Sequence, residues 1–206
     1  MFAFTRGTGT IVWVAARALL VFTLILGIGY TLTMTGLARS IFPAQADGSL
    51  VKDATGAVVG SSLIGQSFTD ADGNPLPEYF QPRPSAAGEG YDGGASSGSN
   101  LGPENPDLLA TIADRQDRIS DLEGLAASDI PADAVTASAS GLDPHISVEY
   151  ALLQVNRIAA ERGIPVPEVL ELVRSHTQSR DLGYLGEPRV NVLEINLELT
   201  RMEEAG

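Results

Sequence analysis

Hydrophobic residues are distributed unevenly, with one uninterrupted apolar run near the N-terminus. From Ala18 to Ala38 the sequence reads ALLVFTLILGIGYTLTMTGLA without a charged residue, and Arg17 and Arg39 flank this run. At about 1.5 Å per residue, a helix of this length spans roughly 31 Å, the thickness of a bilayer core. The pattern predicts a transmembrane helix over residues 18–38, a short cytoplasmic segment over 1–17 and a single domain over 39–206.

A cleaved signal peptide is the competing interpretation of the apolar run. Ala44-Gln45-Ala46 fits the small-x-small cleavage pattern, but Ile41-Phe42-Pro43 separates it from the run. Signal h-regions are also shorter, about 7–15 residues. The length therefore favours a retained single-pass anchor in the cell membrane. Positive charges on its two sides are nearly balanced, and they lean slightly towards a cytoplasmic N-terminus and an extracytoplasmic main domain.

One face of the predicted membrane helix carries only small side chains. Thr23, Gly27, Thr31 and Thr35 recur every four residues and form a stripe along one side. Helices in lipid associate through close backbone contact across small residues, and threonine hydroxyls can add hydrogen bonds. The stripe is a candidate contact for a partner helix. The alternative is that these residues are simply common in membrane helices.

The domain begins with short apolar segments between turn-forming clusters. Residues 50–68 contain valine, leucine and isoleucine among Gly and Ser, and they predict two short strands. Residues 69–75 form a turn cluster. The Gly-, Ala- and Ser-rich stretch 85–102 has the composition of a flexible linker, but its position between structured segments fits a long ordered loop equally well.

Three amphipathic helices follow. Asn105, a capping residue, precedes a proline and starts the first helix. The second runs from Ser147 to Gly163, and the third follows Pro167. The spacing of apolar residues predicts the inward positions. These are Leu108, Leu109, Ile112, Ile119 and Leu122, then Val148, Leu152, Val155 and Ala159, and finally Val169, Leu170 and Val173.

Two further strands complete the predicted domain. Residues 134–140 have the composition of a short strand. Residues 193–199 alternate apolar and polar side chains with period two, the pattern of a half-buried strand. The predicted fold class is α+β, with about three helices on a small sheet.

Charge and composition exclude several functions. After Ala38, 11 Lys and Arg stand against 26 Asp and Glu, a net charge of −15. Nucleic acid is therefore not a partner, because its binding requires Lys and Arg on phosphates. Docking to anionic lipid heads is also disfavoured. The chain has no cysteine, which excludes disulfides, thiolate nucleophiles and Cys-ligated metals.

Motifs for catalysis are weak. Ser96 lies in a G-x-S-x-G string, but that motif needs a strand before it and a helix after it, and neither flank fits. His145 and His176 are far apart, and we interpret them as a hydrogen-bonding loop residue and a residue at a helix end. Lys52 is the only lysine, which rules out a phosphate-binding P-loop. The residues predict a membrane-anchored non-enzyme without catalytic, cofactor or metal residues.

Three segments resemble the KdpC family, the C subunits of potassium-transporting P-type ATPases. The first covers residues 41–50. The second runs through 79–103 and contains S-G-S-N-L. The third starts at residue 135 with V-T-A-S-A-S-G-L-D-P-H-I-S and ends with L-G-E-P-R-V-N-V-L-E-I-N-L at residue 197. The resemblance covers about residues 12 to 200 in the right order, and these strings are too long to agree by chance.

The resemblance implies a retained anchor, an ordered loop at 85–102 and a place in a high-affinity potassium uptake complex. Its partners would be a P-type ATPase subunit, a channel-like potassium-translocating subunit and a very small membrane subunit. This subunit alone would bind no cofactor, since ATP and potassium are handled by the complex. The family role is a catalytic chaperone that raises the ATP affinity of the ATPase subunit.

A domain outside the membrane cannot reach ATP in the cytoplasm. An acidic outer domain that covers the potassium entrance and stabilises the assembly therefore fits the predicted topology better. The charge would then raise the local potassium concentration, or it would serve only for solubility. The alternative class is a membrane-anchored extracytoplasmic solute-binding domain or hydrolase.

Overall fold

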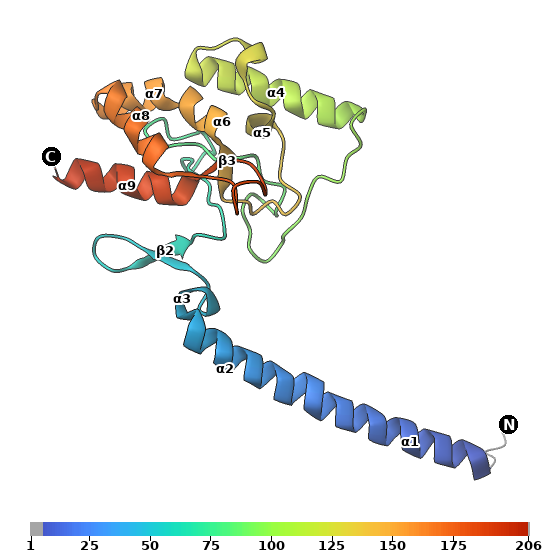
Figure 1. The fold of residues 1–206 in the computed structure, drawn as a ribbon. Coiled ribbons are helices and arrows are strands. Elements are labelled where there is room, and N and C mark those ends of the chain that lie inside the picture. The colour runs from blue at the N-terminus through green and yellow to red at the C-terminus, as the bar shows by residue number, and fades with distance from the viewer. Residues whose placement is uncertain (1–5, 206) are drawn as a thin grey trace. The chain divides into compact units, whose positions relative to one another are not determined.

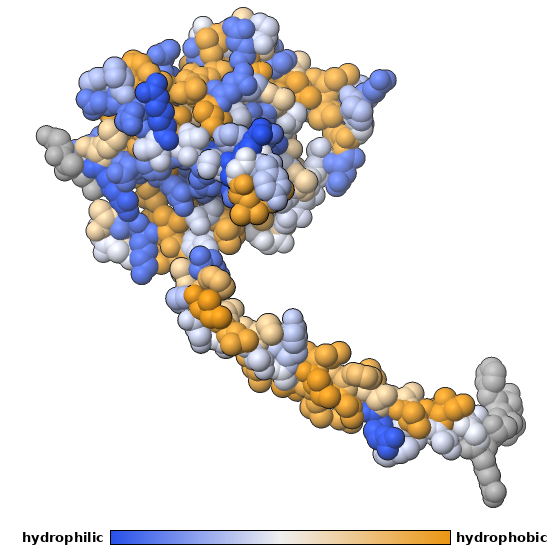
Figure 2. Space-filling view, in the orientation of Figure 1, coloured by the Kyte–Doolittle hydropathy of each residue, from blue (hydrophilic) through white to orange (hydrophobic). Residues whose placement is uncertain are grey.

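The computed structural model describes residues 6–205, and the chain divides after Ser49 into two compact units (Figure 1). The first unit contains a continuous helix from Gly7 to Ile41 whose most apolar window has no buried residue. It consists of α1 (Arg6–Phe22), a π-helical segment η1 (Thr23–Tyr30) and α2 (Thr31–Ile41). By length and composition this helix could cross a membrane. Figure 2 shows hydrophobic residues along most of it.

The helix is longer than the predicted span of 18–38, which lies inside it. After Phe42 the short helix α3 (Pro43–Ala46) turns the chain, and Arg39 Nε lies 3.6 Å from Asp47 Oδ1 across this turn. Both side chains are mostly exposed, so this ion pair adds little stability.

The second unit holds two small sheets. Two short strands do lie within 50–68, as the antiparallel hairpin of β1 (Leu50–Lys52) and β2 (Val58–Ser61), but the apolar Leu63 and Ile64 lie in the turn that follows β2. The second sheet has the order β3-β5-β4, and both of its pairings are antiparallel. Its strands are β3 (His145–Ser147), β4 (Thr177–Gln178) and β5 (Arg189–Asn191).

Helices make up much of the rest of the second unit (Figure 1). They are α4 (Pro106–Glu123), η2 (Ala127–Asp129), α5 (Ala132–Val135), α6 (Val148–Leu153), α7 (Val155–Arg162), α8 (Val166–Ser175) and α9 (Val192–Ala205). Two of the predicted helix starts are confirmed: Asn105 accepts from the backbone N–H of Asp107, and Ser147 from that of Tyr150. The helix predicted from Ser147 to Gly163 is divided at Gln154 into α6 and α7, and α8 begins at Val166, just before Pro167. Gly163 ends α7 with φ 64°, a conformation that glycine adopts without strain. The mixed α+β class is therefore confirmed.

The strand predicted at residues 193–199 is wrong, because these residues belong to α9. Leucine and glutamate favour helices, and seven alternating residues are too few to separate period two from a helical period. The buried positions Val192, Ile195 and Leu199 have the spacing of a helical face. The strand that the sheet does contain here is β5, its central strand, which ends at Asn191 directly before α9 begins.

The strand predicted at residues 134–140 is also wrong. Ala134 and Val135 end the single turn of α5, and an irregular loop follows. The hydroxyl of Ser138 accepts from Gly141 N at 2.9 Å, and that of Ser140 accepts from Leu142 N at 3.1 Å. Such local bonds compete with a strand ladder.

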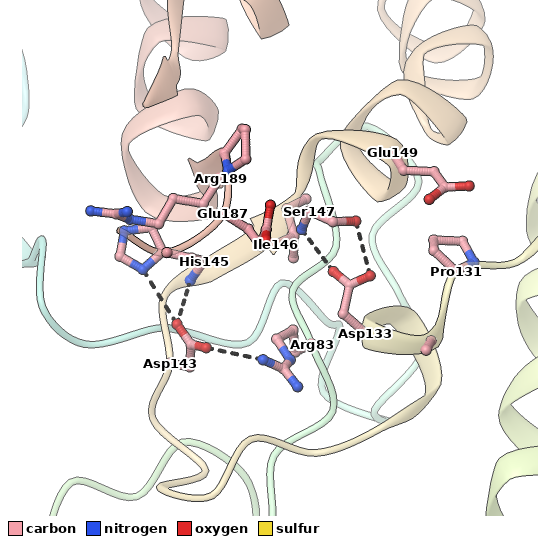
Figure 3. A pocket seen from close by; sticks show the side chains of 13 residues that line it. Arg83, Pro131, Asp133, Asp143, His145, Ile146, Ser147, Glu149, Glu187 and Arg189 are labelled. Atoms are coloured by element: carbon pink, nitrogen blue, oxygen red, sulfur yellow. Dashed lines mark hydrogen bonds and ion pairs between the residues drawn. The ribbon is translucent and has the colours of Figure 1, made fainter. Parts of the chain in front are cut away.

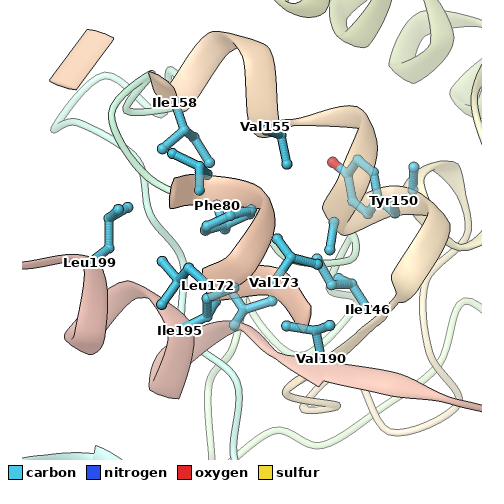
Figure 4. Packing of buried hydrophobic residues seen from close by; sticks show 14 of the residues in the cluster. Phe80, Ile146, Tyr150, Val155, Ile158, Leu172, Val173, Val190, Ile195 and Leu199 are labelled. Atoms are coloured by element: carbon cyan, nitrogen blue, oxygen red, sulfur yellow. The ribbon is translucent and has the colours of Figure 1, made fainter. Parts of the chain in front are cut away.

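The core lies between the C-terminal helices and the three-stranded sheet (Figure 4). Val169 and Val173 of α8 are fully buried, as predicted, while Leu170 is only half-buried at its edge. Leu109 and Leu152, predicted to face inward, are instead 53% and 42% exposed. Phe80, which comes from a loop far away in the sequence, is fully buried among these helices.

Candidate functional site

Two buried side-chain amides hold the loop around Phe80. Asn196 of α9 accepts from Phe80 N and donates to Phe80 O, both at 2.9 Å. Gln154, between α6 and α7, accepts from Gln81 N at 2.6 Å and donates to Gln81 O at 3.2 Å. Asn196 is 2% exposed and Gln154 is fully buried. These amides satisfy backbone groups as a neighbouring strand would.

Arg157 of α7 extends this clamp to α4. Its Nε donates to Glu123 Oε1 at 2.8 Å, and the side chains of the pair are only 6% and 2% exposed. Its other nitrogens donate to the carbonyls of Pro77 and Tyr79 and to Gln154 Oε1. Burial raises the pKa of Glu123, and the charge of Arg157 offsets part of that effect. The polar contacts therefore join loop 77–81 to two helices.

The stretch 85–102 is a long ordered loop, which is one of the two predicted alternatives, and not a flexible linker. Ser85 Oγ donates to Gly141 O at 2.6 Å and accepts from Tyr91 N at 2.8 Å. Ser97 N donates to Ser140 O at 2.9 Å. A Cβ on Gly98 would lie 3.0 Å from the carbonyl oxygen of Ala139, so this backbone approach suits glycine.

A depression of about 640 Å³ lies beside β3 (Figure 3). At its rim, Arg83 Nη1 lies 3.1 Å from Asp143 Oδ2, and His145 Nδ1 lies 3.3 Å from Asp143 Oδ1. Burial would raise the pKa of Asp143, but its hydrogen bonds with His145 and the charge of Arg83 outweigh burial and lower this pKa. The carboxylate thus stays charged and fixes Arg83 to the end of β3.

Two aspartates also cap the backbone of β3. Asp143 accepts from His145 N at 3.0 Å. Asp133 of α5 accepts from Ser147 N at 2.7 Å and from the Ser147 hydroxyl at 2.9 Å. Edge N–H groups are where another strand would add. The carboxylates occupy these donors, so the depression is not suited to binding an extended peptide as an added strand.

The small-residue stripe lies on the exposed helix. Gly27 has only Thr23 Cγ2 near its missing Cβ, at 3.8 Å, so there is room for close approach. Thr35 Oγ1 donates to Thr31 O at 2.9 Å and Thr31 Oγ1 to Leu26 O at 3.5 Å, so these hydroxyls bond within the helix. Residues four apart lie less than one turn apart in η1 and slightly more than one turn apart in α2. The two deviations oppose each other and keep the stripe straighter than in a pure α-helix.

Two of the three candidate catalytic side chains bond to backbone carbonyls, and the third contacts a carboxylate. Ser96 Oγ donates to Ser140 O at 3.0 Å. His176 caps the C-terminus of α8, with Nδ1 3.0 Å from Leu172 O, and His145 contacts Asp143 in the loop before β3. His176 therefore lies at a helix end, as predicted, whereas His145, predicted in a loop, is the first residue of β3. Across residues 6–205, no three acidic or histidine side chains gather in a metal-binding arrangement.

Sequence reasoning missed the residues that organise this site. Arg83, Asp143, Gln154 and Asn196 were not singled out, because their partners lie 60 to 116 residues away along the chain. Arg83 and Asp143 do lie in the strings that carry the family resemblance. Those strings meet in space, since segment 83–98 contacts segment 138–143. Contact between these two segments in the fold explains why both of them carry the resemblance.

Within residues 6–205, the fold and these contacts define a protein with one apolar helix long enough to cross a membrane and an α+β domain whose loops are fixed by polar clamps. The family model described as KdpC, K+-transporting ATPase, c chain, matches residues 12–201. The chain belongs to the KdpC family and is a subunit of a potassium-transporting complex.

Potassium-transporting ATPase KdpC subunits from three organisms illustrate the similarity. The subunit from Beijerinckia indica is 53% identical over 186 residues, which cover 88% of this chain and 89% of the relative. The Myxococcus xanthus subunit is 51% identical, covering 91% of this chain and 86% of the relative. The Mycobacterium tuberculosis subunit is 50% identical, with coverages of 91% and 96%.

Proposed function

We propose that this chain is a non-catalytic subunit that assembles with the ATP-hydrolysing subunit of a potassium-transporting P-type ATPase and activates it. The observation that carries the proposal is the use of its reactive side chains. Ser96 and His176 bond to backbone carbonyls, and His145 pairs with a charged aspartate. A nucleophile needs a base within hydrogen-bond reach, and the partner of Ser96 Oγ is a carbonyl oxygen instead.

The exposed helix supports membrane assembly. Its apolar surface requires lipid or other helices around it. The stripe of Thr23, Gly27, Thr31 and Thr35 is the proposed contact with a helix of the ATPase or channel-like subunit. The very small membrane subunit completes the proposed set of partners.

The proposed topology places the N-terminus in the cytoplasm and residues 39–206 outside. Residues 39–206 carry a net charge of −15, which would then face incoming potassium. Salt screens such a field beyond about 8 Å, so only a domain close to the channel entrance would raise the local potassium concentration. Covering of this entrance is the second part of the proposal.

Reconstitution of the complex tests the activating role. Without this chain, potassium-stimulated ATP hydrolysis by the remaining subunits should fall, and the KM for ATP should rise. The full chain should restore both. Residues 40–206 alone should restore them poorly, since membrane tethering supplies the high effective concentration. ATP hydrolysis by the purified chain alone would contradict the proposal.

The variant Ser96→Ala separates the proposed role from a hydrolase. It removes one hydrogen bond in an exposed loop, so the restored activity should stay close to wild type. A loss of several orders of magnitude, with the complex still assembled, would instead assign Ser96 a catalytic role.

Cysteine labelling tests the topology. Ser128 and Ser179 are exposed in the domain. Cysteines at these positions should react with an impermeant thiol reagent in intact cells. A cysteine at Gly7, where nothing lies within 4 Å of the added Cβ, should react only after permeabilisation. The reverse labelling pattern would show that the N-terminus lies outside and the domain lies in the cytoplasm.

A further inference from the structure

Nearly all arginines of the domain are matched by carboxylates. The structure describes nine arginines within residues 50–205, and eight of them lie within 3.9 Å of an Asp or Glu oxygen. Arg115 of α4 is the exception among these nine. It is half-buried, and its Nη1 donates to the carbonyl of Val135 at 2.9 Å. A guanidinium has five N–H donors, so one carbonyl leaves the charge of Arg115 without a counterion.

The surroundings of Arg115 do not compensate its charge. Burial lowers the pKa of Arg115, and the charge of Arg118, one turn further along α4, lowers it again. Arg118 itself is mostly exposed and faces Asp114. Burying a charge without a partner costs stability. A glutamine at position 115 could donate to the carbonyl of Val135 without that cost, so folding alone does not explain the arginine.

Arg115 lines a pocket of about 390 Å³ that is formed by α4, α6 and the loop of residues 67–91. Among the described residues, those around this pocket include no Asp or Glu, although all 26 acidic residues of the chain lie after Ala38. Arg83 and Arg118 line it too, but their charges are matched by ion pairs. The volume lies in the range of small-molecule sites, about 300–1,000 Å³. The pocket is therefore a positive site within an acidic domain.

A second donor without a partner lines the same pocket. Tyr150 belongs to the buried cluster of Figure 4 and is only 3% exposed. Its backbone N–H donates to Ser147, but no described residue hydrogen-bonds to its hydroxyl. Burial raises the pKa of Tyr150, so this hydroxyl stays protonated and can donate. A buried hydroxyl without a partner costs free energy, and the pocket is the space in which a ligand can supply one.

The walls and the charge of the pocket define the class of ligand. One unmatched guanidinium suits one negative charge, and its planar fork matches a carboxylate. A phosphate carries more than one negative charge at neutral pH, which would leave an excess in a domain of net charge −15. The apolar side chains around the pocket suit the body of an organic molecule. They are Pro75, Pro82, Pro84, Ile119 and Leu122.

We propose that this pocket binds a small organic carboxylate, with its carboxylate held by the Arg115 guanidinium and the Tyr150 hydroxyl and its apolar body against the proline and aliphatic walls. This site goes beyond the proposed role in assembly. It uses residues of this chain alone, so it can be tested without the other subunits of the complex.

Binding of benzoate to the purified full chain in a non-ionic detergent tests the site. The ionic strength is held constant with sodium chloride, because salt screens exposed charges. Benzoate should bind saturably in isothermal titration calorimetry and should raise the melting temperature. Acetate, which lacks the apolar body, and inorganic phosphate are the comparison probes. Each should bind at least about ten-fold more weakly than benzoate.

Two variants connect this binding to the pocket. Arg115→Gln keeps a donor for the carbonyl of Val135 and should weaken benzoate binding at least about ten-fold. Tyr150→Phe removes only the hydroxyl, so it should weaken binding several-fold. Without benzoate, its melting temperature should be unchanged or higher, because the lost hydroxyl had no partner. Arg174→Gln is the matched control, an exposed arginine on α8, and should bind benzoate like wild type.

Several results would overturn the site. They are no saturable binding of benzoate, equal binding by wild type and Arg115→Gln, and stronger binding of phosphate than of benzoate. If Arg115→Gln does not fold, Tyr150→Phe decides, and unchanged binding or a lower melting temperature without benzoate would overturn the site. None of these measurements involves another subunit, so their failure is distinguishable from failure of the proposed assembling role.

Discussion

The helix of residues 7–41 and the domain after Ser49 use hydrophobic and polar residues in opposite ways. In the helix, apolar side chains face outward and backbone polar groups are satisfied within the segment. In the domain, polar side chains turn inward: Gln154 is fully buried, and Asn196 is 2% exposed. The second sheet of the domain has strands of only two or three residues. Side-chain amides and an arginine therefore replace the strand ladder that would otherwise hold its loops.

The comparison predicts that removing an inward polar side chain destabilises the folded domain. Arg157→Ala should have the largest effect, a loss of about 3–5 kcal/mol, because it leaves the carboxylate of Glu123 buried and uncompensated. Thermal and denaturant unfolding of the purified chain, followed by circular dichroism, measures this. Arg174→Ala is the control, since its pair with Glu171 is 71% exposed on both sides and is worth at most about 1 kcal/mol. Similar losses in both variants would refute the buried clamp.

Asn196→Ala should be the next most severe substitution, costing roughly 2–3 kcal/mol. It removes both hydrogen bonds to Phe80 and leaves a buried N–H and carbonyl without their partner. Asn156, exposed on α7, is the matched control, and its replacement by alanine should be neutral or slightly stabilising because alanine favours helices. Equal denaturant midpoints for the two variants would show that the amide does not hold the loop.

Lowering the pH should reveal a smaller contribution to the stability of the fold, made by Asp143 at the rim of the depression. The pKa of Asp143 lies below its ordinary value of 3.8 in the folded chain. Its stabilising effect is therefore complete above that ordinary value and is lost as the pH falls through the lowered pKa. Asp143→Asn should be less stable than wild type at neutral pH, and the difference should shrink below about pH 4. A constant difference over this range would assign the effect to lost packing instead.

Substitutions in the helix should leave domain folding unchanged and act on assembly. Gly27→Leu fills open space, so the domain should unfold at the wild-type temperature. A bulky side chain on the stripe should nevertheless reduce co-purification with the other ATPase chains, because close backbone approach is blocked. Leu26→Ala, off the stripe, should co-purify normally. Indistinguishable behaviour of the two variants would remove the stripe as a contact.

Local signals made several elements predictable. The long apolar helix was predictable because hydropathy is summed over many adjacent residues. Asn105 and Gly163 mark helix ends through bonds and dihedral angles that involve only their neighbours. Prediction failed where the local pattern of apolar and polar residues is compatible with either a strand or a helix. Residues 193–199 fit a strand or a helix, and the choice was made by burial of Ile195 and Leu199 against α8 and the sheet.

The sequence by itself determined the long apolar helix, the α+β class, the acidic character and the family strings. Only the tertiary structure decided which distant residues meet: Asn196 lies 116 positions from Phe80, and Asp143 lies 60 positions from Arg83. It also decided that Leu182, apolar by sequence, stays in water on a strained turn. The physical reason is that helix caps and hydropathy act within a few residues, whereas hydrogen-bond partners and exposure exist only once the whole chain has folded.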